Sequence, residues 1–173
     1  QFPFSSWLPR AMEGPSSSSS IFYGSLAVHL GIFLLLRTFP LWSHDYFIRG
    51  LLVAVGLISA ISGTLISRVQ SGVKSQLAYS TVVQIGFMLM ELGFGLNGFV
   101  LFHVVGHSFL RAYQFLVSPS VLSYLSHHMI FHFKPRVKVL RSNFLERIHS
   151  AIYLFSIKEF GLDYFMYRFL WTP

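Results

Sequence analysis

Three ionisable side chains occur at helical spacing within one apolar stretch, because His103, His107 and Arg111 occupy positions i, i+4 and i+8. Residues at this spacing share one face of a helix. Histidine titrates near neutral pH, and each imidazole can pass a proton to a neighbour or to a bridging water. Arginine stays charged and cannot release a proton in this way. The stripe therefore predicts a proton relay in which Arg111 sets the local field.

Two other interpretations of this stripe remain open. The same side chains can hydrogen-bond to a neighbouring helix and serve packing alone. A metal or haem site is the weaker alternative, since two histidines at this spacing need further ligands and neither a carboxylate nor a cysteine is near in sequence. We therefore predict no catalytic residue, no metal site and no cofactor.

The apolar segment before the stripe carries polar groups at both ends. Lys74 precedes it, either extending its amine to the membrane surface or, if drawn inward, acting as a proton carrier. Glu91 near the far end is either an exit-side proton acceptor or an interfacial carboxylate. Between them, Tyr79, Ser80 and Gln84 are expected to hold water or to hydrogen-bond between helices.

A further histidine, His29, occurs in the first apolar segment, with Tyr23 six residues before it. An ionisable group inside a membrane span costs at least about 2.5 kcal/mol on insertion scales, so it marks a pathway or a buried partner by default. We include both residues as supporting polar groups.

Composition indicates which elements position these groups. Of the 173 residues, 53% are apolar and 11% are charged, and the mean hydropathy is +0.58. Ordinary soluble domains have about 25% charged residues, and disordered chains lack this much apolar surface. The sequence therefore predicts an integral membrane protein of the all-α class, a bundle of about four transmembrane helices.

The apolar segments set the expected boundaries, since a span needs about 20 helical residues. A transmembrane region is expected over 1–117, a basic, histidine-rich cytoplasmic loop over 118–142, and amphipathic interfacial helices over 143–173. The four spans are expected near residues 16–37, 49–67, 75–96 and 98–117.

The net charge of +7 is consistent with basic residues that flank membrane spans. Alternation across four spans would place most of the flanking cations on one side, which the positive-inside rule makes cytoplasmic. These residues are Arg10, Arg68, Lys74, Lys134, Arg136, Lys138 and Arg141, against Arg37 and Arg49 on the other side. We expect the bacterial inner membrane as the location, a lipid bilayer as partner, and no nucleic acid.

Three phrases of the sequence resemble motifs of one protein family. These are FPFSSWLPRAMEGP at 2–15, VKSQLAYSTVVQIG at 73–86 and FHVVGHSFLRA at 102–112. They are similar to phrases of the proton-conducting subunits shared by complex I (subunit L and its relatives), Mrp-type sodium/proton antiporters and the membrane partner in DAB-type inorganic-carbon uptake. The family's broken-helix lysine would precede Gln1, so we expect a fragment of a longer subunit.

The resemblance implies that Lys74, His103 and His107 match central positions of the family's proton path. The sequence departs from the family at two places. Arg111 stands where the family has lysine, and Tyr23 stands where it has histidine, with His29 as a possible replacement. Since arginine does not release its proton, a simple lysine-to-lysine relay does not fit this chain.

The resemblance and the residues together predict proton translocation by a Lys/His/water relay within a larger complex. The expected partners are other membrane or peripheral subunits, with Na⁺ as an alternative ion. The chain alone is not expected to be an enzyme, although it could serve an NADH:quinone oxidoreductase-like translocase. One alternative is the membrane partner of an inorganic-carbon uptake complex driven by proton flux, and the other is a non-conducting anchor for a soluble enzyme.

Overall fold

The computed structural model describes residues 1–12, 14–132, 144–161, 164 and 167–168, and every regular element in these residues is a helix. The predicted all-α class is confirmed. The elements are α1 (Trp7–Ala11), α2 (Ser16–Ser18), the π-helix η1 (Ser19–Leu26), α3 (Ala27–Trp42), α4 (Tyr46–Val69), α5 (Val73–Gly93), α6 (Asn97–His132), α7 (Phe144–Ile157) and the short 3₁₀ helix η2 (Glu159–Gly161).

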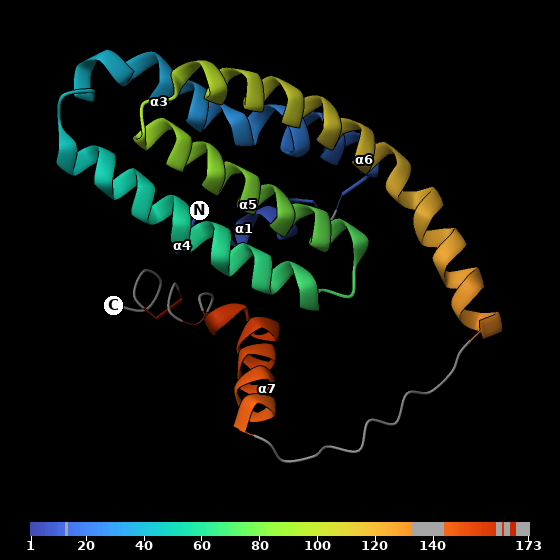
Figure 1. Ribbon diagram of the computed structural model, residues 1–173. Coiled ribbons are helices and arrows are strands. Elements are labelled where there is room, and N and C mark those ends of the chain that lie inside the picture. The colour runs from blue at the N-terminus through green and yellow to red at the C-terminus, as the bar shows by residue number, and fades with distance from the viewer. Residues whose placement is uncertain (13, 133–143, 162–163, 165–166, 169–173) are drawn as a thin grey trace.

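Helix α5 occupies the middle of the bundle (Figure 1), in contact with α4 on one side and with α3 and α6 on the other. Helices α2, η1 and α3 follow one another without a break from Ser16 to Trp42. Within the described residues, two helical stretches are long and apolar enough to cross a bilayer, Ser19–Trp42 and Tyr46–Val69, each of 24 residues. The other two expected spans correspond to α5 and α6, whose facing sides carry polar residues.

Small residues allow α4 and α5 to approach closely. A Cβ atom added to Gly56 would lie 2.5 Å from the carbonyl oxygen of Gly86, and one added to Gly86 would lie 2.7 Å from the carbonyl oxygen of Gly56. Close backbone packing at small residues is a principal way in which helices associate where water does not drive them together. This contact fixes α5 against α4 and leaves its opposite face toward α6.

Two apolar clusters fix the remaining helices around α5. One joins α3, α5 and α6 and includes Ile32, Met88, Leu92 and Val100. The other joins α1, α5 and α6. The second consists of Leu8, Met12, Ala78, Val82 and Phe115, with Tyr23 packed against it.

Helix α6 is longer than the expected fourth span. It continues past Val117 to His132, so the first part of the expected loop 118–142 is helical, and residues 133–143 lie outside the described residues. Pro119 lies inside this helix and has no N–H to donate to the carbonyl of Phe115. The Ser118 hydroxyl donates to that carbonyl at 2.9 Å. The carbonyl of Phe115 therefore keeps a hydrogen-bond donor where the helix continues through Pro119.

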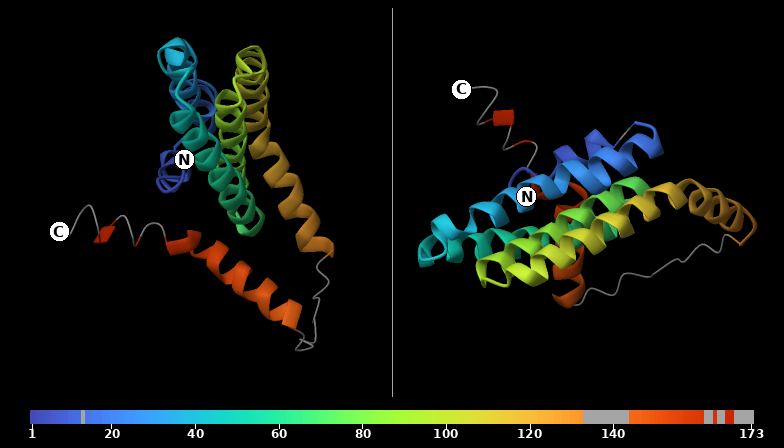
Figure 2. Two further views of the ribbon diagram at one scale, coloured as in Figure 1. Left: turned by 60° about the vertical axis from the view of Figure 1, so that its left-hand side comes forward. Right: turned by 90° about the horizontal axis from the view of Figure 1, so that it is seen from above.

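The last part of α6 extends away from the other helices, and α7 contacts α4 (Figure 2). Helix α7 falls within the segment 143–173 that the sequence predicts to be helical and amphipathic. Several of its large apolar side chains are exposed, among them Ile148, Ile152 and Leu154. Its position at a membrane interface stays a prediction.

Candidate functional site

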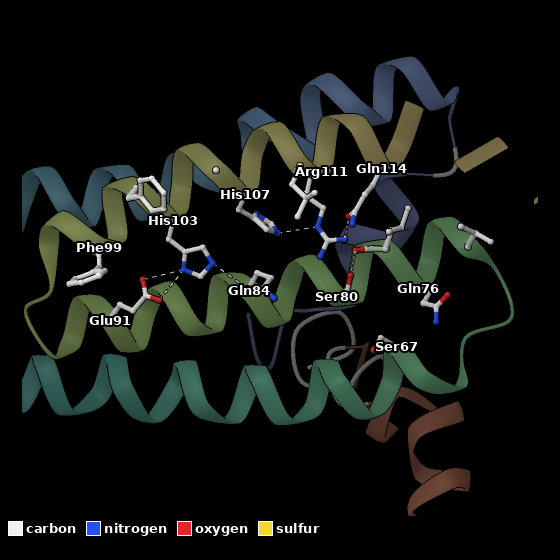
Figure 3. Close-up of a pocket in the computed structure, with 15 residues that line it drawn as sticks. Ser67, Gln76, Ser80, Gln84, Glu91, Phe99, His103, His107, Arg111 and Gln114 are labelled. Carbon is white, nitrogen blue, oxygen red and sulfur yellow. Dashed lines mark hydrogen bonds and ion pairs between the residues drawn. The ribbon is translucent and has the colours of Figure 1, made fainter. Parts of the chain in front are cut away.

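A cleft of about 760 Å³ runs along the facing sides of α5 and α6 (Figure 3). Its apolar lining includes Leu77, Phe99, Phe102 and Leu110. The polar side chains that line it are Ser67, Gln76, Ser80, Gln84, Glu91, His103, His107, Arg111 and Gln114. Helical periodicity explains the composition, because Ser80, Gln84 and Glu91 share one face of α5, as His103, His107 and Arg111 share one face of α6.

One half of the cleft contains a paired acid and base. His103 Nδ1 lies 2.9 Å from Glu91 Oε1 and 3.2 Å from Oε2, and His103 Nε2 lies 3.2 Å from Gln84 Oε1. A carboxylate and an amide oxygen both accept hydrogen bonds, so with Gln84 in this orientation both ring nitrogens donate. We call Glu91, His103 and Gln84 the Glu91 half, and its geometry suits an imidazolium paired with a carboxylate.

The other half contains a chain of hydrogen bonds with a fixed direction. Arg111 Nε donates to His107 Nε2 at 3.0 Å, and guanidinium is only a donor. His107 must therefore carry its proton on Nδ1, which lies 2.9 Å from His29 Nε2. His29 in turn carries its proton on Nδ1 and donates to the Ser25 carbonyl at 2.8 Å. Both histidines are thus neutral and hold one tautomer each.

Arg111 has a second acceptor, since its Nη1 donates to Gln114 Oε1 at 2.8 Å. Arg111, His107, His29 and Gln114 are called the Arg111 half below. This half is more deeply buried than the other, with Arg111 5% and His107 6% exposed, whereas the His103 and Glu91 side chains are 26% and 28% exposed.

The two halves approach each other at His103 and His107. Their ring centroids are 6.2 Å apart and the rings are nearly perpendicular, at 89°. No hydrogen bond joins these two residues in the described structure, so a proton passing between them needs a bridging water or a movement of a ring. The cleft provides polar walls and volume for such a water.

The structure brings together only some of the residues that the sequence singles out. Ser80, Gln84, Glu91, His103, His107 and Arg111 line the cleft, and His29 reaches it through His107. Three others lie outside its lining. Lys74 donates from Nζ to the Gly14 carbonyl at 2.9 Å, Tyr79 is fully buried, and Tyr23 packs against the cluster around Leu8 and Phe115.

Three further polar residues line the cleft that the sequence did not predict as site residues: Ser67, Gln76 and Gln114. Gln114 follows Arg111 by three residues, a spacing that predicts a shared helical face. Gln76 stands two residues after Lys74. Ser67 comes from α4, so its presence depends on how α4 packs against α5 and carries no signal in the sequence.

The local path of η1 determines which residue of the first span meets His107. Ser19, Ser20 and Gly24 of this π-helix are buried, and the Ser20 hydroxyl donates to the Ala112 carbonyl at 2.9 Å. A Cβ atom on Gly24 would lie 2.9 Å from the Phe115 ring. This close approach to α6 brings His29, one turn beyond η1, within hydrogen-bonding distance of His107.

Comparison with known proteins agrees with the three motifs. Residues 1–135 match the family described as NADH:quinone oxidoreductase/Mrp antiporter, TM. The chain is 42% identical to the probable inorganic carbon transporter subunit DabB2 of Halothiobacillus neapolitanus over 125 residues, which is 72% of this chain and 22% of that protein. It is 40% identical to the chloroplastic NAD(P)H-quinone oxidoreductase subunit 5 of Manihot esculenta over 122 residues, which is 70% of this chain and 16% of that protein.

The chain thus spans about a fifth of the length of these relatives. The match includes α1 to α6 and therefore both halves of the cleft. The resemblance predicted from the three motifs is confirmed. The chain belongs to the transmembrane family of NADH:quinone oxidoreductase and Mrp antiporter subunits, and it is an integral membrane protein.

Proposed function

We propose that this chain translocates protons across the membrane as part of a larger complex, along the polar side chains of the cleft between α5 and α6. The observation that carries the proposal is the Glu91–His103 pair, 2.9 Å apart, in the same cleft as His107. Ionisable groups inside membrane helices that face one another and a polar cavity are typical of proton pathways.

Each half of the cleft has a different part in this proposal. In the Glu91 half, His103 exchanges a proton with the Glu91 carboxylate, because a small movement along their hydrogen bond suffices. Transfer onward to His107 goes through water in the cleft, since the rings do not bond directly. Ser80 lies on the same lining and adds a polar contact for that water.

Arg111 controls whether His107 can take the proton. His107 Nε2 accepts from Arg111 Nε, so this nitrogen can bind a proton only when the guanidinium moves aside. His107 Nδ1 is already protonated in this arrangement. Arg111 therefore acts as a positioning residue and supplies a fixed positive charge, while Lys74 at the start of α5 stands at the cytoplasmic side of the path.

A flux measurement on the full-length protein in its native complex, reconstituted in liposomes, tests the proposal. The double variant His103→Ala/His107→Ala should abolish proton flux. His44→Ala is the matched control, because His44 is exposed and lies outside the lining of the cleft. Undiminished flux in the double variant would contradict the relay, whereas absence of flux in the wild-type complex would favour a non-conducting anchor for a soluble enzyme.

The relatives favour two kinds of complex. One relative is a subunit of an NAD(P)H-quinone oxidoreductase and another is a subunit of an inorganic carbon transporter. Purifying the full-length protein from its membrane and identifying stoichiometric partners by mass spectrometry distinguishes the two. Quinone-reductase or antiporter subunits would support an energy-converting module, and a single large soluble enzyme would support inorganic-carbon uptake.

A further inference from the structure

Arg111 is a buried positive charge at one end of a cavity. Arg111 is only 5% exposed. Its side chain lines the cleft together with those of Gln114 and Ser80. A guanidinium stays charged in a protein. Removing a charge from water is unfavourable unless a group of opposite charge accompanies it.

No carboxylate of the described residues lies within ion-pair distance of Arg111, whose bonds go to His107 and Gln114. Glu91, the carboxylate of the cleft, is engaged by His103. His107 is neutral in this arrangement, because Arg111 occupies its Nε2 as a donor. The Arg111 half thus carries one positive charge that the described part of the chain does not balance.

Donors at this end of the cleft are free to receive a ligand. The two bonds of Arg111 use Nε and Nη1, and Nη2 has no partner among the described residues. Gln114 accepts through Oε1, which leaves its amide N–H groups able to donate. The first turn of α5, with Val73 and Gln76, lines the same end of the cleft, and a helix N-terminus carries partial positive charge.

We propose that the Arg111 end of the cleft binds a small monovalent inorganic anion, a halide or an oxyanion of bicarbonate size. One uncompensated guanidinium matches one negative charge. Nη2 of Arg111 and the amide of Gln114 donate to the anion, and water fills the remaining space of the cleft. This binding site shares Arg111 with the proposed proton path, but the proposal does not rest on proton translocation, since an anion can bind whether or not protons pass.

Equilibrium binding of isotopic chloride to the full-length protein in mild detergent tests this site, with gluconate replacing chloride at constant ionic strength. Wild-type protein should bind chloride saturably, and Arg111→Gln should abolish binding. Arg37→Gln should leave it unchanged, because Arg37 is exposed on α3 and does not line the cleft. Competition by bicarbonate separates a site that accepts oxyanions from one that takes halides alone.

A second variant keeps the test valid if Arg111→Gln does not fold. Gln114→Leu retains the guanidinium and removes one donor, so chloride affinity should fall several-fold while binding stays saturable. Absence of saturable chloride binding to wild type would overturn the proposal and favour a carboxylate from another subunit as the partner of Arg111. Binding that persists in Arg111→Gln, or a response to anionic lipid without one to chloride, would overturn it as well.

Discussion

The two halves of the cleft use the same residue type in opposite ways. His103 in the Glu91 half lies between two acceptors, a carboxylate and, in the orientation described for Gln84, an amide oxygen, so both of its ring nitrogens are placed to donate. His107 in the Arg111 half lies between a donor-only guanidinium and a second imidazole, so it is neutral with one tautomer. One helical turn along α6 therefore separates an imidazole suited to proton exchange from one whose protonation needs Arg111 to move.

This difference shows that a stripe of histidines is not by itself a relay. Spacing along α6 determines that the side chains share a face, whereas their partners on α3 and α5 determine which of them holds a proton. In this chain the rate of any proton transfer should depend most on the partner of His103 and next on the partner of His107.

The largest expected change in proton flux comes from a substitution in the Glu91 half. Glu91→Gln removes the carboxylate that exchanges a proton with His103, and a positioned acid or base contributes about 100-fold to proton-transfer rates. Proton flux in liposomes should therefore fall by about 100-fold. Glu159→Gln, outside the cleft, is the charge-matched control. Proton flux within about twofold of wild type would remove Glu91 from the path.

The second prediction compares the amide of each half. Gln114→Leu takes an acceptor from the buried Arg111, and a lost hydrogen bond to a buried charge costs about 2 kcal/mol of unfolding free energy. Gln84→Leu takes an acceptor from His103, which is 26% exposed, so water can replace it and the loss should stay below about 1 kcal/mol. Denaturation of the full-length protein in detergent measures the loss of unfolding free energy in each variant. Equal losses of unfolding free energy in the two variants would mean that water reaches both halves of the cleft to the same extent.

The third prediction concerns Arg111→Lys, which introduces the residue that the resemblance of the 102–112 motif implies at this position. Lysine presents a compact ammonium that can lose its proton when desolvated, and it lacks the planar fork that holds His107 and Gln114 together. Arg111→Lys should raise proton flux several-fold. Arg37→Lys, on the exposed side of α3, should not change it. A lower flux in Arg111→Lys would show that the guanidinium assists transfer and does not restrain His107.

Helical periodicity explains how much of the site could be predicted from sequence. The positions of His103, His107 and Arg111 on one face follow from their spacing alone, as do those of Gln84 and Glu91. Lys74 shows the limit, because its amine donates to the Gly14 carbonyl, a contact set by how the chain before α2 packs against α5. The end expected for the fourth span at residue 117 also differs from the structure, because α6 continues through Pro119 to His132.

The smallest expected effect concerns His29, the residue that the sequence could place in the first span but not opposite His107. The π-helix η1 brings it there. A double-mutant cycle of His29→Phe and His107→Phe should give a coupling of about 1 kcal/mol in unfolding free energy, in the range known for hydrogen bonds between membrane helices. The matched cycle of His29 with His103, which are not bonded to each other, should be additive. Because His29 completes the chain that begins at Arg111, a coupling near zero with His107 would mean that Arg111 alone determines the tautomer of His107, and the Arg111 half would then need no partner on α3.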